Sequence, residues 1–243
     1  MNNINEKHVV EIVTDYDKLS ERCIEVDTSK KNINIQDIVL KLKNTIRANN
    51  DIIGLSANQI GFDKRVICLN FNGELRTFVN PIITNAGPLE LVQETCHSEP
   101  GKKFIRLRHN RVEVTYQTPL SKIESVKLFG MAARAIQHHI DHLDGLLLSD
   151  IGLEIEDDFL NASEEEKQEV ISMYLDSLDL ALKDIEVSIE EDKDAKQLRD
   201  ATKFMESVRN GETIIESVPL TDAEIEEFKK KYEAEHANEF ATE

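Results

Sequence analysis

The chain has 243 residues, 47 of them acidic and 29 basic, so its net charge is −18 near neutral pH. Such an excess of negative charge is unsuited to neutralising phosphates, which argues against nucleic acid as a partner. No stretch approaches the ~20 apolar residues of a membrane span, no signal peptide is recognisable, and the cysteines Cys23, Cys68 and Cys96 are widely spaced, so we expect a soluble cytoplasmic protein.

The first predicted helix follows a polar stretch near the N-terminus. Ile35, Ile38, Val39, Leu42 and Ile46 fall on one helical face, and the run ends at the polar residues 49–51. The small residues that follow, 54–61, begin and end with glycine. They predict a tight loop or bulge at which the backbone approaches another group closely.

Several β-branched segments with turn residues between them predict strands. These segments are Arg65–Asn70, Thr77–Val79, Glu90–Gln93, Arg111–Tyr116 and Ile123–Leu128. They precede one central helix and show no regular alternation of strand and helix. This order predicts an α+β fold with largely antiparallel sheets.

The central helix carries a pair of histidines. Apolar residues from Leu128 and Phe129 through Leu143 recur at helical spacing, and His138 and His142 stand four residues apart within that run. Residues at positions i and i+4 lie on one helix face, so both imidazoles can reach one metal ion. Two surface histidines on an amphipathic helix remain the alternative, because the pattern is short.

The chain changes character after Gly152. From Ile151 onward it holds 28 acidic and 10 basic residues, so this part carries the whole net charge. We therefore divide the chain into residues 1–152 and an acidic helical extension, residues 153–243. Helices are expected at about 163–185, after a capping box at Ser163–Glu166, and at about 195–209 and 221–239. The extension could bind a protein partner or simply be solvated.

A metal site of the zinc type needs a third protein ligand beside the two histidines. Cys96 is the best candidate, because it lies in the segment Glu94–Gly101, just after a predicted strand. A thiolate with two imidazoles suits Fe(II), Zn(II), Ni(II) or Co(II), and is too soft for magnesium or calcium. Cys96 taken alone would more often be a small buried hydrophobic residue.

Three segments together resemble, in order and spacing, the signature motifs of peptide deformylases. They are Gly54–Gln59, Glu94–Ser98 and His138–His142; the family patterns are a glycine-bracketed loop ending in Gln, Glu-Gly-Cys-Leu-Ser, and His-Glu-x-x-His. The segments Glu11–Val26 and Asp141–Gly145 are also similar, so the resemblance spans about residues 9–150. It implies a deformylase-like fold with mostly antiparallel sheets around a central metal-binding helix.

The resemblance also implies the roles of single residues. Cys96, His138 and His142 would hold one divalent metal, Fe(II) first, with zinc, nickel or cobalt as alternatives. Gln59 and the backbone N–H of His97 would donate to the formyl oxygen, where negative charge develops in the transition state. Hydroxide formed at the metal would attack the formyl carbon of an N-formylmethionyl nascent peptide.

Other residues would act around the ligands. By the same resemblance, Glu94, Ser98 and Asp141 would orient the metal ligands. Lys103 and Arg108 stand where the family keeps basic residues near the mouth of the peptide site.

One departure from the family pattern bears on activity. His139 stands where the family has the catalytic Glu that takes a proton from water and delivers it to the leaving nitrogen. An imidazole has a suitable pKa for a base, but its shape and reach differ from those of a carboxylate. Smaller departures are Thr95 for Gly, His97 for Leu and Ile52 for Gly.

Two functions therefore stand. The first is a metal-dependent deformylase that removes the formyl group from N-formylmethionyl peptides, with His139 as a substitute base. The second is a catalytically weak or inactive protein of deformylase fold with a scaffolding or assembly role, in which the C-terminal helices bind a protein partner. The unusual extension would fit a viral source such as a bacteriophage.

Overall fold

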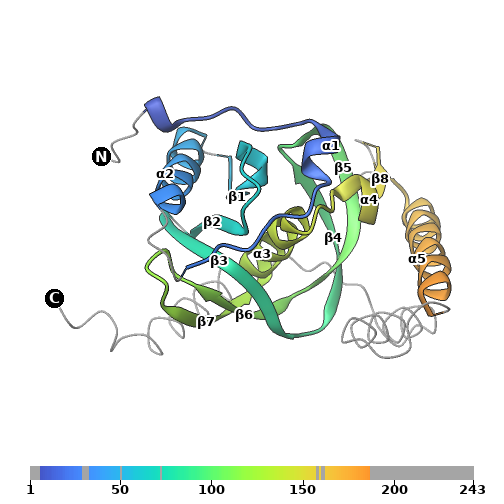
Figure 1. Cartoon of the computed structure of the whole chain (residues 1–243). Helices are drawn as coiled ribbons and strands as arrows, with labels where there is room; N and C mark the ends of the chain where they lie inside the picture. The colour runs from blue at the N-terminus through green and yellow to red at the C-terminus, as the bar shows by residue number, and fades with distance from the viewer. Residues whose placement is uncertain are drawn as a thin grey trace.

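Two antiparallel sheets enclose one long helix in the computed structural model, which describes residues 6–28, 33–49, 51–71, 73–156, 159 and 162–186 (Figure 1). The N-terminal elements are η1 Glu6–His8, α1 Tyr16–Leu19, α2 Ile33–Ala48, β1 Gly54–Ser56, η2 Asn58–Ile60, β2 Val66–Phe71 and β3 Glu74–Ala86. They are followed by β4 Leu89–Cys96, β5 Glu99–His109, β6 Arg111–Gln117, β7 Ile123–Phe129, α3 Gly130–Leu143, α4 Leu148–Ile151, β8 Leu153–Ile155 and α5 Glu164–Glu186.

The first sheet has the strand order β1-β2-β3-β6-β7, and all its pairs are antiparallel. The strand β2, between β1 and β3, is buried on both faces: Val66 and Cys68 pack toward α2, and Ile67 and Leu69 toward α3. Because successive strand residues point to opposite faces, a strand covered on both sides reads as a continuous apolar run. The run Val66–Leu69 has that character.

The second sheet has the order β4-β5-β8 and lies on the other side of α3 (Figure 1). A two-residue turn, His97–Ser98, joins β4 to β5, so Cys96 is the last residue of β4. The α3 helix ends beside Gly145, whose φ of 78° favours glycine; a Cβ there would lie 2.3 Å from the Ser20 carbonyl oxygen. The C-terminal end of α3 is thus fixed by a close approach to the Ser20 backbone that only glycine allows.

These observations confirm the α+β class and the antiparallel sheets. The central helix is shorter than predicted, because Leu128 and Phe129 end β7 and α3 begins at Gly130. Residues 54–60 form β1 and a 3₁₀ turn, where the sequence predicted a loop. The strand β5 was missed, since its proline, glycine and charged residues interrupt the apolar alternation.

The second sheet includes residues that lie beyond Gly152. β8 pairs with β5 through Leu153–Ile155, so the sheet takes up the first residues of the predicted extension. The capping box before α5 is confirmed: Ser163 and Glu166 exchange hydrogen bonds between side chain and backbone. The helices predicted at 195–209 and 221–239 lie outside the described residues, and the domain division stays a prediction.

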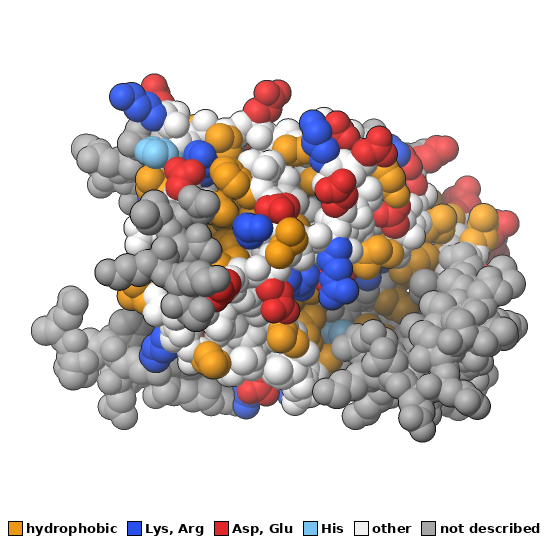
Figure 2. Space-filling model, viewed as in Figure 1, with side chains coloured by type: hydrophobic (Ala, Val, Ile, Leu, Met, Phe, Trp, Pro, Cys, Tyr) orange, Lys and Arg blue, Asp and Glu red, His pale blue; other side chains and the backbone are white. Residues whose placement is uncertain are grey.

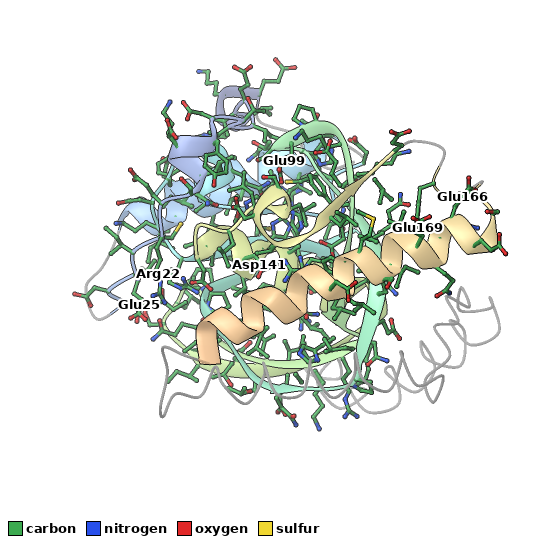
Figure 3. All side chains as sticks on the ribbon, turned by 90° about the vertical axis from the view of Figure 1, so that its right-hand side faces the viewer. Arg22, Glu25, Glu99, Asp141, Glu166 and Glu169 are labelled. Atoms are coloured by element: carbon green, nitrogen blue, oxygen red, sulfur yellow. The ribbon has the colours of Figure 1, made fainter. Side chains whose placement is uncertain are left out.

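The α5 helix covers the outer face of the second sheet (Figure 3). Tyr174, 3% exposed, packs on Ile105 and Ile155, and its hydroxyl accepts a hydrogen bond from the Leu107 N–H at 3.2 Å. Glu166 and Glu169 lie exposed on the same helix. Figure 2 shows acidic and basic side chains interspersed over another face of the molecule. None of the helices in the described part of the chain is long and apolar enough to cross a membrane.

We expect Tyr174→Phe to lower the free energy of unfolding by about 1 kcal/mol, because the ring stays buried while the Leu107 N–H loses its acceptor. Urea denaturation of the full chain measures this change. Met173→Leu, at an exposed neighbouring position, is the control and should stay within about 0.5 kcal/mol of the parent chain. Equal stability of the two variants would contradict the structural role of the Tyr174 hydroxyl.

Candidate metal centre

Three side chains suited to a metal meet where β4 ends against α3. The ligand atoms of Cys96, His138 and His142 all lie within 4.8 Å of one another, and the Cys96 sulfur is 3.2 Å from Nε2 of His142. Ligands around a tetrahedral zinc-like ion are about 3.5 Å apart, as follows from metal–ligand bonds of about 2.1 to 2.3 Å. The donor set therefore fits one divalent transition metal after a small closure.

His138 is oriented by a carboxylate behind it. Its Nδ1 lies 3.2 Å from Oε2 of Glu94, so the Nδ1–H group donates a hydrogen bond to the carboxylate. Its Nε2 is then left for a metal. Carboxylate–histidine pairs of this kind fix the tautomer and the ring orientation of metal ligands. The contact agrees with the orienting role that the sequence assigned to Glu94.

A buried ion-pair network holds Glu94 in turn. Arg108, 2% exposed, donates two hydrogen bonds to the Glu94 carboxylate at 2.7 and 2.8 Å, and a further one to Asp141. Arg106 also donates to Asp141, at 2.9 Å. Arg108 thus lies behind the ligands, and its predicted place at the mouth of the peptide site is wrong. Lys103 pairs in β5 opposite Ile155 and does not line the cavity either.

Burial and pairing together decide which of these groups is charged. Burial alone would raise the pKa of Glu94, but hydrogen bonds from Arg108 and His138 outweigh it and hold this pKa well below its usual range. Burial would lower the pKa of His138, but hydrogen bonds to Cys96 and Glu94 outweigh it and raise the pKa to about 9. Burial, and then the charge on His138, lower the pKa values of His139 and His142 well below 6.5.

Gln59 lies beside Cys96 and is held at both ends of its amide. Its Oε1 accepts hydrogen bonds from the backbone N–H and the hydroxyl of Ser56, at 3.0 and 3.1 Å. Its Nε2 lies 3.1 Å from the Ser98 hydroxyl and 3.7 Å from the Cys96 sulfur. The acceptor end is therefore fixed by Ser56, which leaves the donor end facing the ligands. Sequence reasoning missed Ser56, although it lies within the glycine-bracketed segment.

His139 follows the first histidine of the pair and is 5% exposed. Its Nε2 lies against Gly54, where a Cβ would approach that nitrogen to 2.7 Å. Its Nδ1 is buried and has no hydrogen-bond partner among the described residues. The glycine therefore makes room for the imidazole, and one ring nitrogen has no partner among the described groups.

A cavity of about 220 Å³ opens beside the candidate ligands. His97 stands at its wall, with Nε2 3.1 Å from a carboxylate oxygen of Asp51 in the segment before β1. Its other lining residues come from the segment before β1, from η2, from the end of β4 and from one face of α3: Ile53, Gly54, Gln59, Gln93, Glu94, Thr95, Cys96, Met131, Arg134, Ala135, His138 and His139. The structure thus brings every predicted catalytic and metal residue to one place, with His142 behind the others.

Sequence reasoning missed several residues of this wall, among them Met131, Arg134 and Asp51. Met131 and Arg134 precede His138 by seven and four positions, so helical periodicity alone would have placed them on the face of the ligands. For Asp51 no local signal exists, because its contact with His97 joins segments 46 positions apart.

Comparison with known proteins gives one consistent family. The family described as polypeptide deformylase matches residues 9–154. A peptide deformylase of Thermosynechococcus vestitus is 35% identical over 128 residues, which are 50% of this chain and 68% of that protein. One from Pelotomaculum thermopropionicum is 42% identical over 95 residues, which are 39% of this chain and 61% of that protein.

Solved structures agree with this result. The peptide deformylase of Thermotoga maritima is 29% identical with a TM-score of 0.55, over 59% of this chain and 97% of that one. The deformylase of the Vibrio parahaemolyticus bacteriophage VP16T, solved in complex with actinonin, is 31% identical with a TM-score of 0.52. That match covers 57% of this chain and 99% of the phage protein. The predicted deformylase-like fold is confirmed.

We expect Glu94→Gln to weaken zinc or cobalt binding about 10- to 100-fold, because the neutral amide orients the His138 ring less firmly. Competition against a chelator with absorbance detection measures the affinity. Glu74→Gln, at an exposed position of β3, removes one carboxylate far from the ligands and serves as the control. Unchanged affinity in Glu94→Gln would show that His138 does not depend on this carboxylate.

Proposed function

The chain belongs to the peptide deformylase family, and from this premise we propose that it is a metal-dependent hydrolase that removes the formyl group from N-formylmethionyl peptides. The observation that carries the proposal is the meeting of Cys96, His138 and His142, because Cys96 and His138 line one cavity together with Gln59. Nascent peptides carry such a formyl group, so the substrate would place the protein in the cytoplasm.

Cys96, His138 and His142 would hold the metal, with Fe(II) as the first choice and zinc, nickel or cobalt as alternatives. Three protein ligands of this kind are the usual number in catalytic sites, and soft sulfur with imidazole excludes calcium and magnesium. When bound, the metal supplies Lewis acidity, which activates water for attack near neutral pH.

Gln59 and the backbone N–H of His97 would bind the formyl oxygen. The Gln59 amide cannot turn without losing its hydrogen bonds to Ser56, so its N–H group is oriented before the substrate arrives. Donors fixed in advance stabilise the charge that develops on the oxygen, and removal of one typically costs ~10²–10³ in rate.

His139 would act as the base. In its neutral form the ring can accept a proton at Nδ1, the buried nitrogen without a hydrogen-bond partner among the described residues. The same imidazole would then return the proton to the leaving nitrogen. A general acid–base of this kind contributes typically ~10²–10⁴ in rate.

A second candidate function rests on the same residue. The His139 ring is almost fully buried and packs against Gly54, and a buried imidazole is a weaker base than a solvated one. A chain that binds metal but turns over slowly could serve an assembly or scaffolding role. Its partner would then bind the C-terminal helices, of which α5 exposes Glu166 and Glu169.

Formate release from a formyl-Met peptide separates the two candidates. We expect the Fe(II)- or Ni(II)-loaded full chain to release formate, and His139→Ala to lower kcat by ~10²–10⁴, because the ring that carries the proton is lost. Metal content is measured alongside, so that a lost metal is not mistaken for a lost base.

His139→Glu is the informative second variant. If the parent chain binds about one equivalent of metal and releases no formate, while His139→Glu does release it, the enzyme proposal is overturned and the scaffold candidate stands. If the chain binds no metal, the candidate metal site is refuted for the enzyme and for the scaffold alike.

A further inference from the structure

One arginine, Arg134, lines the cavity one helical turn away from the candidate ligand His138. Met131, Arg134, Ala135 and His138 lie along the same face of α3 and all line the cavity. Arg134 precedes His138 by four residues, which is about 6 Å along the helix axis. If the formyl group binds at the ligands, Arg134 stands within reach of the first side chain of the peptide.

Among the described residues, the Arg134 guanidinium is bound by the carboxylate of Glu90. Its Nη2 donates to Oε2 of Glu90 at 3.1 Å, and the other oxygen of Glu90 accepts a hydrogen bond from the Asn110 amide at 2.9 Å. The Nε of Arg134 is buried and has no acceptor among the described residues. A guanidinium has five N–H donors, so most of its capacity is not used by the described part of the chain.

The rest of the wall is mixed in polarity. Gln93, Thr95 and Asp51 line the cavity together with the apolar Ile53 and Ala135. A wholly apolar side chain that filled this space would remove water from the guanidinium without replacing its hydrogen bonds, which is costly. A side chain that brings its own acceptor avoids this cost.

The acceptor should be neutral. The ion pair already formed with Glu90 balances the charge of Arg134, and the carboxylate of Asp51 lies in the wall of the cavity. A carboxylate on the incoming side chain would face both of these groups, whereas a carboxamide or sulfoxide oxygen would not be repelled.

We propose that Arg134 is a specificity-determining residue, which selects N-formyl peptides whose first side chain has the length of methionine and ends in a neutral acceptor oxygen. Methionine sulfoxide and glutamine are side chains of this class. The inference rests on the proposed function, because it assumes that the formyl group binds at Cys96, His138 and His142.

Peptides of equal length test the inference on the metal-loaded full chain. Formyl-Met(sulfoxide)-Ala-Ser carries the acceptor oxygen, formyl-norleucine-Ala-Ser lacks any acceptor, and formyl-Glu-Ala-Ser adds a charge. We expect kcat/KM for the sulfoxide peptide to exceed that for the norleucine peptide about tenfold, as a hydrogen bond to a charged donor would give. The glutamate peptide should rank below the sulfoxide peptide.

Arg134→Met should reverse the preference between the sulfoxide and norleucine peptides, because it makes the wall apolar. Lys102→Met removes a cation from an ion pair of the same 3.1 Å length outside the cavity, so it should leave the ratio unchanged. A parent chain that favours norleucine, or an equal ratio in Arg134→Met and the parent, would overturn the inference.

Binding separates this inference from the proposed function. Calorimetry with the deformylated peptides Met(sulfoxide)-Ala-Ser and norleucine-Ala-Ser reports the pocket without turnover. If the chain releases no formate but binds Met(sulfoxide)-Ala-Ser ten times more tightly than norleucine-Ala-Ser, the deformylase activity is rejected and the role of Arg134 is supported. Formate release without preference in either measurement would reject the role of Arg134 alone.

Discussion

The buried ion pair between Glu94 and Arg108 is the interaction on which the rest of the site depends. It joins β4 to β5 and, through Asp141, the second sheet to α3. Burial of these charges would be costly without their mutual hydrogen bonds, and loss of one partner would leave the others uncompensated. The same carboxylate faces Nδ1 of His138, so the network that joins sheet and helix also orients the first histidine of the candidate metal site.

The three candidate metal ligands and His139, the proposed base, are held in different ways in this chain. Cys96 is set by a two-residue turn, and His138 and His142 by the helix and the carboxylate behind it. His139 sits in a space that is open only because residue 54 is glycine. Glycine at position 54 therefore allows an imidazole at position 139, beside the three candidate ligands.

The C-terminal part of the chain is connected to this network through β5. Tyr174 on α5 binds the backbone of Leu107, and the residues on either side of Leu107 are the two arginines that reach Asp141. The helix predicted as an appendage thus covers the outer face of the sheet whose inner side carries Glu94. Its exposed glutamates face away from this contact, which leaves the acidic surface of α5 accessible (Figure 3).

The sequence determined, through local periodicity, the apolar face of α2 and most of the strands. It also placed His138 and His142 one helical turn apart on the same helix. The three ordered motifs then indicated the family and the position of Cys96. Only the tertiary structure decided where Arg108 lies, since charged residues break the apolar pattern of β5 and its partner Asp141 is distant in the chain. An ion pair between residues 94 and 108, or a contact between 51 and 97, leaves no periodic signal, because it joins side chains of separate segments that only the folded chain brings together.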